Sequence, residues 1–404
     1  ILEQSILTTG PISLSAYMRQ CLTNPEYGYY TTRNPLDTLT GDFVTSPEIS
    51  LVFGEMIGIW LYSTWVSQGK PKKVSVVEFG PGKGTLMFDV ISCFQKLNKS
   101  HAELSIVMIE ASPVLKNEQS MLLCNRKISD LNNASTIWSN CTIEWAETEK
   151  DIIDDPSYTN YILAHEFFDA LPIKAFQKVQ DGTWREFLVE HSKSVLNTQG
   201  KLPQPDTESC KIDETLETDF HLTLSPKETP IAHIPKNTPR FQNLSNGSRI
   251  EICPDAQLYM SKMASLVRET GAVLVVDYGI DSGVPDSTLR GIYKHKFVSP
   301  FFKPGDVDLS IDVDFPNLKE IVEGPAVGKG HKVYGPTDQG DWLHNIGIGY
   351  RIDQLIKMNQ DRPEEQDKVY QSYLRLTGKD EKSMGKVYKF LAVLPPKTAS
   401  SPGF

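Results

Sequence analysis

One stretch in the first quarter of the chain, Val74–Thr85, restricts the possible folds more than any other feature. It begins with β-branched apolar residues that are typical of a central parallel strand. Glycines then alternate along residues 80–84, so a tight turn without Cβ atoms allows a ligand to lie against the backbone. The amphipathic run 85–94 predicts a helix whose positive N-terminal end points at that ligand. This order predicts a Rossmann-like α/β fold with a ligand at the turn.

The acidic residue just before the glycines, Glu78, narrows the choice of ligand. A carboxylate disfavours an anionic pyrophosphate and favours the amine of a methionine moiety or a ribose hydroxyl. The spacing Gly80-x-Gly82-x-Gly84 also differs from the Gly-x-Gly-x-x-Gly of dinucleotide-binding turns and lacks the Lys-Ser/Thr pair of a P-loop. The turn therefore favours S-adenosylmethionine, with a plain structural connection as the alternative.

A second acidic residue supports this interpretation. The apolar run 104–109 predicts the next strand, and Glu110 follows it directly. At that place in a Rossmann-like unit a carboxylate can accept hydrogen bonds from both ribose hydroxyls. Solvation of a strand end is the alternative role for Glu110.

Composition excludes several classes of protein. The chain has 404 residues and a net charge of −10, which argues against a nucleic-acid-binding protein. Six scattered cysteines form no Cys-x-x-Cys pair and no His-Glu-x-x-His occurs, so we predict a reducing compartment and no metal. The apolar stretch 49–66 contains Glu55 and two glycines, which predicts a buried helix rather than a membrane span.

The remaining pattern alternates strands with helical stretches, as in a parallel α/β sheet. Ser13 is a candidate N-cap for a short helix through Leu22, and Asp181-Gly182 predicts a β-hairpin between 173–180 and 183–190. A helix is expected from Pro254 to Thr270, and two more helices in the C-terminal part. The predicted strands are 74–79, 104–109, 142–145, 161–165, 273–278 and 386–394.

Four segments are expected along the chain. Residues 1–70 form a helical N-terminal cap that contributes to the active site, and 71–196 form the first part of the main domain. The polar stretch 197–246 is expected to be an insertion with mobile parts and little core. Residues 247–404 complete the main domain and carry substrate-binding elements.

Two further clusters are candidates for chemistry. Gly41–Glu48 has the composition of a loop folded over a ligand, with a capped helix start as the alternative. His165-Glu-Phe-Phe-Asp169 follows the fourth strand, and carboxyl ends of parallel strands form the ligand crevice, so Glu166 and Asp169 should point into it. Phe167 and Phe168 would either line that crevice or pack in the core.

A third cluster is Asp277-Tyr-Gly279 at the end of the fifth strand. Asp306, Asp308 and His295 are candidates to join it. The alternative is that these carboxylates are solvated loop residues.

Taken together, these motifs resemble the MidA family of class I methyltransferases, which serve as mitochondrial assembly factors for respiratory complex I. The resemblance covers nearly the whole chain apart from 197–246. His165 looks like the mitochondrial form, since bacterial members tend to have Asn there. The matching motifs, in chain order, are Gly41–Glu48, Glu78–Leu86, His165–Pro172, Asp277–Gly279 and Asp312–Phe315.

The resemblance implies a mostly parallel seven-stranded methyltransferase sheet with helical N-terminal and inserted regions. It implies S-adenosyl-L-methionine as the donor and symmetric dimethylation of an arginine on the complex I subunit that helps to line the quinone site. It also implies a location in the mitochondrial matrix and no transmembrane segment. The oligomeric state stays open, with a homodimer as one alternative.

Site residues follow from the same resemblance. Glu166 and Asp169, with Glu48, would clamp the arginine guanidinium, and His165 would take the proton or orient its loop. Asp312–Asp314 follows Leu309–Ile311, where relatives usually show a Thr-Ala pair. This chain departs from the family there, which leaves the role of the loop open. The expected cofactor-binding residues are Glu78, Gly80, Gly82, Gly84, Thr85, Glu110, Thr45 and Ser46.

Two other classes of function remain as alternatives. One is a non-catalytic assembly chaperone that binds S-adenosylmethionine only as part of its structure. The other is a nicotinamide oxidoreductase, which the Gly-x-Gly-x-Gly spacing and Glu78 both disfavour.

Overall fold

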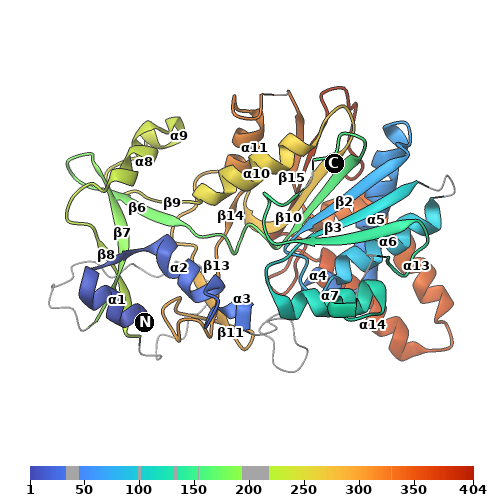
Figure 1. Cartoon of the computed structure of the whole chain (residues 1–404), viewed down its shortest axis with the longest axis horizontal. Coiled ribbons are helices and arrows are strands. Elements are labelled where there is room, and N and C mark those ends of the chain that lie inside the picture. The colour runs from blue at the N-terminus through green and yellow to red at the C-terminus, as the bar shows by residue number, and fades with distance from the viewer. Residues whose placement is uncertain (33–44, 99–101, 131–134, 153, 193–217, 329) are drawn as a thin grey trace. The chain divides into compact units, whose positions relative to one another are not determined.

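The computed structural model describes residues 1–32, 45–98, 102–130, 135–152, 154–192, 218–328 and 330–404 (Figure 1). The chain forms two compact units, each assembled from three stretches of sequence. Unit 1 consists of Ile1–Phe43, Asp169–Gln257 and Ser282–Asp314. Unit 2 consists of Val44–Phe168, Leu258–Asp281 and Phe315–Phe404.

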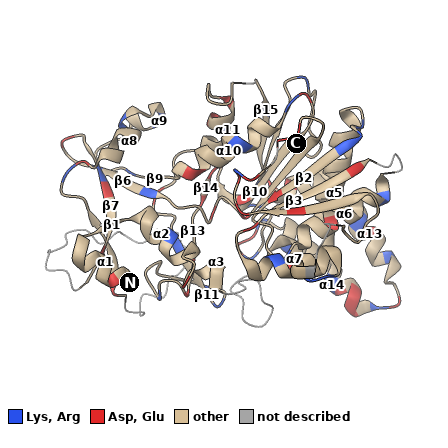
Figure 2. Cartoon of the chain, viewed as in Figure 1, with Lys and Arg blue, Asp and Glu red and all other residues tan. Residues whose placement is uncertain are grey.

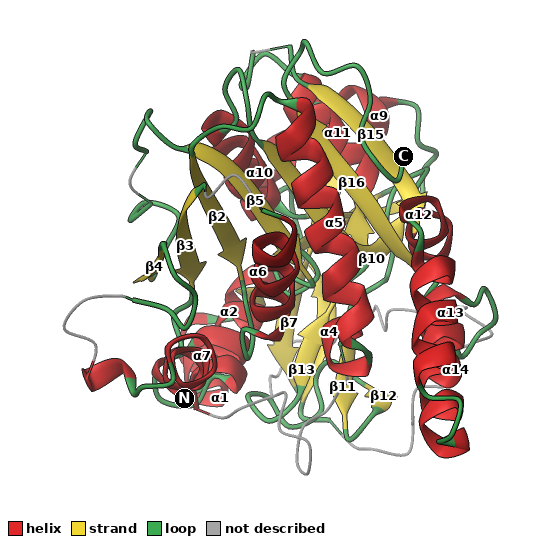
Figure 3. Ribbon diagram, turned by 90° about the vertical axis from the view of Figure 1, so that its right-hand side faces the viewer, coloured by secondary structure: helices red, strands yellow, loops and turns green. Residues whose placement is uncertain are grey.

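Unit 2 is built on one large sheet with the strand order β15-β16-β10-β5-β2-β3-β4 (Figure 3). β2 pairs in parallel with β3 and β5, β3 with β4, and β5 with β10. β16 runs antiparallel to both of its neighbours. The strands are β2 (Lys73–Phe79), β3 (Glu103–Ile109), β4 (Cys141–Ala146), β5 (Thr159–His165), β10 (Ala272–Ile280), β15 (Lys332–Asp338) and β16 (Tyr388–Leu394).

The order of the strands reverses at β2. From β2 the chain passes outward to β3 and β4, and it then returns to β2's other side as β5. In open α/β sheets such a reversal creates a ligand crevice at the carboxyl ends of the two central strands. The predicted mostly parallel sheet is therefore confirmed, with eight strands in the described residues where seven were expected. By this rule its ligand crevice is expected beside the ends of β2 and β5.

Helices cover both faces of this sheet, which explains why its central strands β2, β5 and β10 are mostly buried. α5 (Leu51–Ser67) and α6 (Thr85–Leu97) lie on one face, and α10 (Pro254–Leu266) and α11 (Phe315–Glu323) lie on the other (Figure 3). Val74 and Val76 share a buried cluster with α5 and α6. The other described helices of unit 2 are α4 (Ser46–Ile49), α7 (Pro113–Cys124), η1 (Ile128–Asp130), α12 (Gln339–Ile346), α13 (Ile348–Met358) and α14 (Pro363–Thr377).

Unit 1 combines short helices with two small sheets. One sheet has the order β1-β7-β6-β9 with β8 beside β7, and the other has the order β12-β11-β13. Its strands are β1 (Ile12–Ser13), β6 (Lys174–Lys178), β7 (Trp184–His191), β8 (Phe220–Leu224), β9 (Arg249–Ile252), β11 (Arg290–Tyr293), β12 (Lys296–Val298), β13 (Asp308–Ser310) and β14 (Val313–Asp314). Its helices are α1 (Leu2–Thr9), α2 (Leu14–Thr23), α3 (Tyr29–Thr32), η2 (Pro230–Ala232), α8 (His233–Asn237) and α9 (Pro239–Gln242).

Two local predictions in unit 1 are confirmed. The Ser13 hydroxyl accepts a hydrogen bond from the N–H of Ala16 and caps α2. Asp181-Gly182 closes the antiparallel β6–β7 hairpin, with Gly182 at φ +81°. Both follow from the turn and cap chemistry of the residues themselves.

The stretch 197–246 differs from the expected insertion with little core. Its residues 197–217 lie outside the described part of the chain. Phe220 and Leu222 of β8 are buried in the core of unit 1, and Phe241 is buried in a second apolar cluster. The high content of Pro, Ser and Thr concealed these few apolar anchors. The expected mobility of the stretch stays a prediction.

The expected N-terminal cap, residues 1–70, does not form one body. α1, α2 and α3 belong to unit 1, whereas α4 and α5 belong to unit 2. No helix in the described ranges is long and apolar enough to cross a membrane. Acidic and basic residues are interspersed along the elements of both units (Figure 2).

The glycine directly before β10 allows a prediction about the stability of the folded chain. Gly271 has φ +107°, and a Cβ there would lie 2.4 Å from the carbonyl oxygen of Asn160. Gly69 has φ +84° but open space around it. Gly69→Ala should therefore cost about 1 kcal/mol of unfolding free energy from backbone strain. Gly271→Ala adds a clash with backbone and should cost about 3 kcal/mol or more.

Urea unfolding of the two variants and the wild type measures both costs. The Gly69→Ala variant is the matched control, since it carries the strain without the clash. Equal losses in the two variants would contradict the proposed contact with Asn160.

Candidate functional site

The turn after β2 has the backbone geometry that the glycines predict. Gly80, Gly82 and Gly84 all have positive φ, at 63°, 53° and 84°, a region that other residues rarely adopt. The N–H of Gly84 donates to the carbonyl of Pro81 and closes the turn. Gly84 is the N-cap of α6 and has no side chain to cap it. The first N–H groups of α6 therefore keep their capacity to bind a ligand.

Glu78 lies at the end of β2, directly before this turn. Its side chain is 2% exposed, and its Oε2 atom has no hydrogen-bond partner within the described residues. Burial raises the pKa of this carboxyl to about 8, because desolvation disfavours the charged form. A buried polar atom without a partner is costly and rare. It is the kind of group that a bound ligand satisfies.

Glu110, after β3, is held by hydrogen bonds. Its Oε1 accepts from the N–H of Ser112 at 2.7 Å, and its Oε2 accepts from the side-chain amide of Gln119 at 3.2 Å. Burial raises the pKa of Glu110, and hydrogen bonds from Ser112, Gln119 and the backbone of Ala111 offset part of the rise. A carboxylate has about four acceptor sites. Glu110 thus keeps capacity for a ligand donor.

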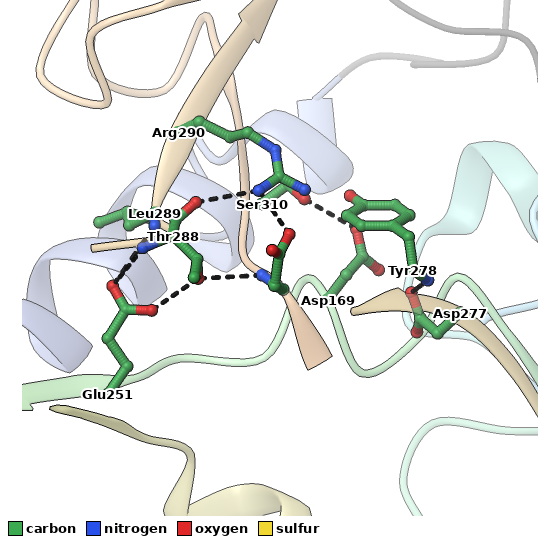
Figure 4. A network of polar contacts seen from close by, with 9 residues as sticks. Asp169, Glu251, Asp277, Tyr278, Thr288, Leu289, Arg290 and Ser310 are labelled. Carbon is green, nitrogen blue, oxygen red and sulfur yellow. Dashed lines mark hydrogen bonds and ion pairs between the residues drawn. The ribbon is translucent and has the colours of Figure 1, made fainter. Parts of the chain in front are cut away.

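The loop after β5 is fixed by a buried carboxylate. Asp277 is fully buried and accepts hydrogen bonds from the backbone N–H groups of Phe167 and Phe168. It also accepts from the N–H of Tyr278 (Figure 4). The prediction that it might be a solvated loop residue is wrong. Asp277 instead holds the loop that follows the neighbouring strand.

Within that loop, Glu166 adopts a left-handed backbone conformation with φ +49°. Such a conformation is uncommon for a glutamate and is often found at functional sites. The N–H of Glu166 donates to the carbonyl of Val276. Its carboxylate Oε1 accepts from the hydroxyl of Tyr388 at 2.9 Å and lies 3.7 Å from His165 Nε2.

His165 is buried, and its Nε2 has no hydrogen-bond partner in the described part of the chain. Burial lowers the pKa of His165 to about 3, because desolvation disfavours the imidazolium. The ring of Phe53 packs against it edge-on. His165 is therefore neutral at physiological pH.

Phe167 joins this loop to the glycine turn. Its Cδ2 atom lies 3.2 Å from the place where a Cβ on Gly80 would be. Its ring also packs edge-on against Phe79 and Tyr259. Phe168 is 2% exposed and belongs to the core. The loop after β5 thus lies directly beside the turn after β2, as the strand order requires.

Glu48 lies at the glycine turn. Its Oε1 accepts from the Thr85 hydroxyl at 2.6 Å, and its Oε2 lies 3.7 Å from Lys83 Nζ. Thr45 is the N-cap of α4, and Ser46 is fully buried against Met384. Residues 41–44 of this predicted loop lie outside the described residues.

The remaining predicted acid, Asp169, belongs to unit 1 and Glu166 to unit 2. Asp169 is buried, and its Oδ2 accepts from the hydroxyl of Ser310 at 3.1 Å (Figure 4). Asp308 is also buried and accepts from the Tyr30 hydroxyl. The prediction of solvated carboxylates is therefore wrong for Asp308, whereas Asp306 is exposed.

Asp312 and Asp314, whose role the sequence left open, are structural. Asp312 accepts from Arg290 at 2.7 Å, and Asp314 pairs with Arg240 through both oxygens. The buried Glu251 accepts from the backbone and hydroxyl of Thr288, and that hydroxyl also accepts from the N–H of Asp312 (Figure 4). These contacts hold together the segments of unit 1.

Two kinds of comparison bear on the identity of this site. The sequence model of a family described as "Putative S-adenosyl-L-methionine-dependent methyltransferase" matches residues 56–336. The chain belongs to this family. The class of protein predicted from the motifs is thereby confirmed, and S-adenosyl-L-methionine is the family's methyl donor.

Curated relatives extend over nearly the whole chain. Human "Protein arginine methyltransferase NDUFAF7, mitochondrial" is 34% identical over 98% of this chain and 82% of its own length. The corresponding Drosophila melanogaster homologue is 35% identical over 98% of this chain and 84% of its own length. A Burkholderia thailandensis protein, crystallised with S-adenosyl-homocysteine, superposes with a TM-score of 0.72 at 20% identity, covering 100% of this chain and 93% of that one. That likeness shows the same fold.

The residues of this methyltransferase fit its donor. The glycine turn leaves its backbone accessible to a ligand. Glu78 has a buried oxygen without a hydrogen-bond partner in the described residues, and Glu110 can accept further hydrogen bonds. No group of three or more His, Cys, Asp or Glu residues that could hold a metal is found among the described residues.

Two residues of the site carry no sequence signal. Tyr388 lies on the last strand and bonds Glu166 across 222 positions, and Gln119 lies on α7 amid other polar residues. A tyrosine in an apolar strand and a glutamine in a helix are both unremarkable choices. Only the three-dimensional contacts distinguish them.

The burial of Glu78 predicts an unusual dependence of stability on pH. Its pKa is raised from 4.5 to about 8 in the folded chain, so the folded state binds one proton more than the unfolded state between these values. Stability should therefore fall as pH rises through this window, by up to about 1.4 kcal/mol per unit. Glu78→Gln removes the effect and should make the donor-free protein more stable than the wild type at pH 8.

Urea midpoints at pH 5, 6.5 and 8 without donor test this expectation. Glu269→Gln, at an exposed ion pair with Lys397, is the matched control and should follow the wild type. Parallel pH profiles of the wild type and Glu78→Gln would show that Glu78 is not buried as a neutral acid.

Proposed function

We propose that this protein is a protein arginine N-methyltransferase of mitochondria. The proposal rests on curated relatives that bear this name and are 32–35% identical over at least 96% of the chain. Following the resemblance in its motifs, we further propose the matrix as its location. Its substrate is then an arginine of the complex I subunit beside the quinone site, which receives symmetric dimethylation.

We assign the donor to the turn after β2. Gly80, Gly82 and Gly84 give its methionine part access to the backbone, and the first N–H groups of α6 face its carboxylate. Glu78 accepts from its amine, and Glu110 accepts from its ribose hydroxyls. Glu48 orients Thr85 and Lys83 at the edge of the turn, and Thr45 and Ser46 begin the helix that carries Glu48.

The chemistry of an arginine acceptor determines what the protein must do. An arginine guanidinium keeps its charge because its pKa exceeds 12. The donor supplies an electrophilic methyl group, so that an N–C bond forms while the C–S bond breaks, its electron pair returns to sulfur, and the nitrogen loses a proton. The chain must hold one guanidinium nitrogen in line with that methyl and stabilise its positive charge.

The position of the Glu166 carboxylate is the observation that supports this proposal most. Its carboxylate follows β5 at the strand-order reversal, its loop contacts the glycine turn through Phe167, and Tyr388 fixes its orientation. The strained backbone of Glu166 is held by Val276 and Asp277. A fixed carboxylate beside the donor turn is what an arginine acceptor requires. Asp169 remains a proposed second member of the clamp.

The role of His165 also follows from its environment. A neutral, buried imidazole with an unpartnered Nε2 can accept a proton or orient the adjacent carboxylate. Because its pKa lies near 3, its own titration should leave the rate unchanged between pH 6 and 8.

Mass spectrometry of the complex I subunit after incubation with enzyme and S-adenosylmethionine tests the activity. We expect mass increases of whole methyl groups on an arginine, with symmetric dimethylarginine as the product. An unmodified subunit, with donor binding intact, would instead support the assembly chaperone that binds donor without catalysis.

Variants of the loop test the assignment of Glu166. Glu166→Gln should reduce kcat/KM by about 100-fold or more, since it removes the charge that pairs with the guanidinium. Tyr388→Phe keeps the charge and should lose about tenfold through disorder of the carboxylate. Both variants should bind S-adenosyl-homocysteine as the wild type does. A wild-type rate for Glu166→Gln would remove this residue from the mechanism.

A further inference from the structure

Gln119 of α7 connects three segments of the donor site. Its side-chain amide donates to the carbonyl of Gly82 at 2.6 Å and to Glu110 Oε2 at 3.2 Å. Its carbonyl oxygen accepts from the indole N–H of Trp145 at 2.8 Å. The turn after β2, the residue after β3 and the end of β4 thus meet at one buried side chain.

The orientation of this amide is unambiguous. An indole N–H can only donate, so the oxygen of Gln119 must face Trp145. The backbone carbonyl of Gly82 and the carboxylate of Glu110 can only accept, so the nitrogen must face them. Both amide hydrogens and the oxygen are therefore used, and Gln119 is 0% exposed. A fully satisfied buried network of this kind holds its members rigidly.

Gln119 also packs against the turn. Its Cγ atom lies 3.3 Å from the place where a Cβ on Gly84 would be. The side chain therefore contacts both ends of the Gly82–Gly84 segment, one through a hydrogen bond and the other through van der Waals contact.

We propose that Gln119 is a positioning residue that fixes the Glu110 carboxylate for the two ribose hydroxyls of the donor. This inference rests on the proposed donor site. The amide and the N–H of Ser112 bind different oxygens of Glu110, and the backbone N–H of Ala111 also interacts with this carboxylate. A carboxylate has about four acceptor sites, so Glu110 keeps capacity for the hydroxyls of a vicinal diol. The same amide also donates to the carbonyl of Gly82, and this hydrogen bond fixes the position of the glycine turn relative to that diol.

Two substitutions separate this role from simple packing. Gln119→Leu keeps most of the volume but removes the amide donor, so Glu110 Oε2 loses this hydrogen bond and the carboxylate is held less firmly. Gln119→Glu keeps the shape but places a second carboxylate against Glu110 and the Gly82 carbonyl. Gln371→Leu, at an exposed position of α14, is the matched control.

The measurement is calorimetric binding of S-adenosyl-homocysteine and of its analogue without ribose hydroxyls. In the wild type the hydroxyls bond a carboxylate, so the hydroxyl-containing ligand should bind about tenfold more tightly or better. In Gln119→Leu this ratio of Kd values should fall to about threefold or less, and in Gln119→Glu binding of the hydroxyl-containing ligand should weaken most. Gln371→Leu should keep the wild-type ratio.

A role in packing alone would weaken both ligands equally and leave the ratio unchanged, and that result would overturn the proposal. Glu110→Gln separates this failure from a failure of the donor site. If Glu110→Gln lowers the ratio and Gln119→Leu does not, only the positioning role of Gln119 is wrong. If neither variant lowers it, the assignment of Glu110 to the ribose is wrong as well.

Discussion

The parallel pairing of β2 with β5 is the constraint on which the rest of the site depends. Their register aligns Glu78 with Leu163 and Phe79 with Ala164, so the two strands end at nearly the same level. The glycine turn and the loop with Glu166 therefore leave the sheet side by side, with β3 on one side and β10 on the other. The fold thus brings the glycine turn and the Glu166 carboxylate, the proposed donor and acceptor groups, to one edge of the sheet.

Buried polar side chains then fix the backbone around that edge. Asp277 binds three backbone N–H groups, and Gln119 binds a carbonyl, a carboxylate and an indole. Each network is stable because its donors and acceptors are matched. Glu78 and His165 differ from them, since each has a buried polar atom without a hydrogen-bond partner within the described residues. This contrast separates the side chains that support the backbone from those with capacity left for a ligand.

The sequence predicted the sheet well because strands buried on both faces are visible as short apolar runs. β2, β3, β4, β5 and β10 were each located to within two residues at either end. α10 ends at Leu266 rather than at the predicted Thr270. The described residues after 314 contain four helices where two were expected. Boundaries of polar helices depend on tertiary contacts that a local pattern does not contain.

The same reasoning explains which features of the site were predicted from the sequence and which were not. Glycines before a helix and acids at strand ends have local signatures, so Glu78, Glu110 and the turn were identified directly. The division into two units has no local signature in the sequence, since each unit joins stretches that are distant in the chain. The role of Asp312 and Asp314 stayed open, because their partners Arg290 and Arg240 are 22 and 74 positions away.

The left-handed backbone of Glu166 has a consequence for protein engineering. Glycine would adopt φ +49° without strain, whereas a glutamate there costs about 1 kcal/mol or more. Libraries selected only for thermal tolerance should therefore accumulate glycine at 166 and lose the carboxylate that we propose binds the acceptor. At this position stability opposes the proposed catalytic role, and stabilising screens of such enzymes need an activity assay as well.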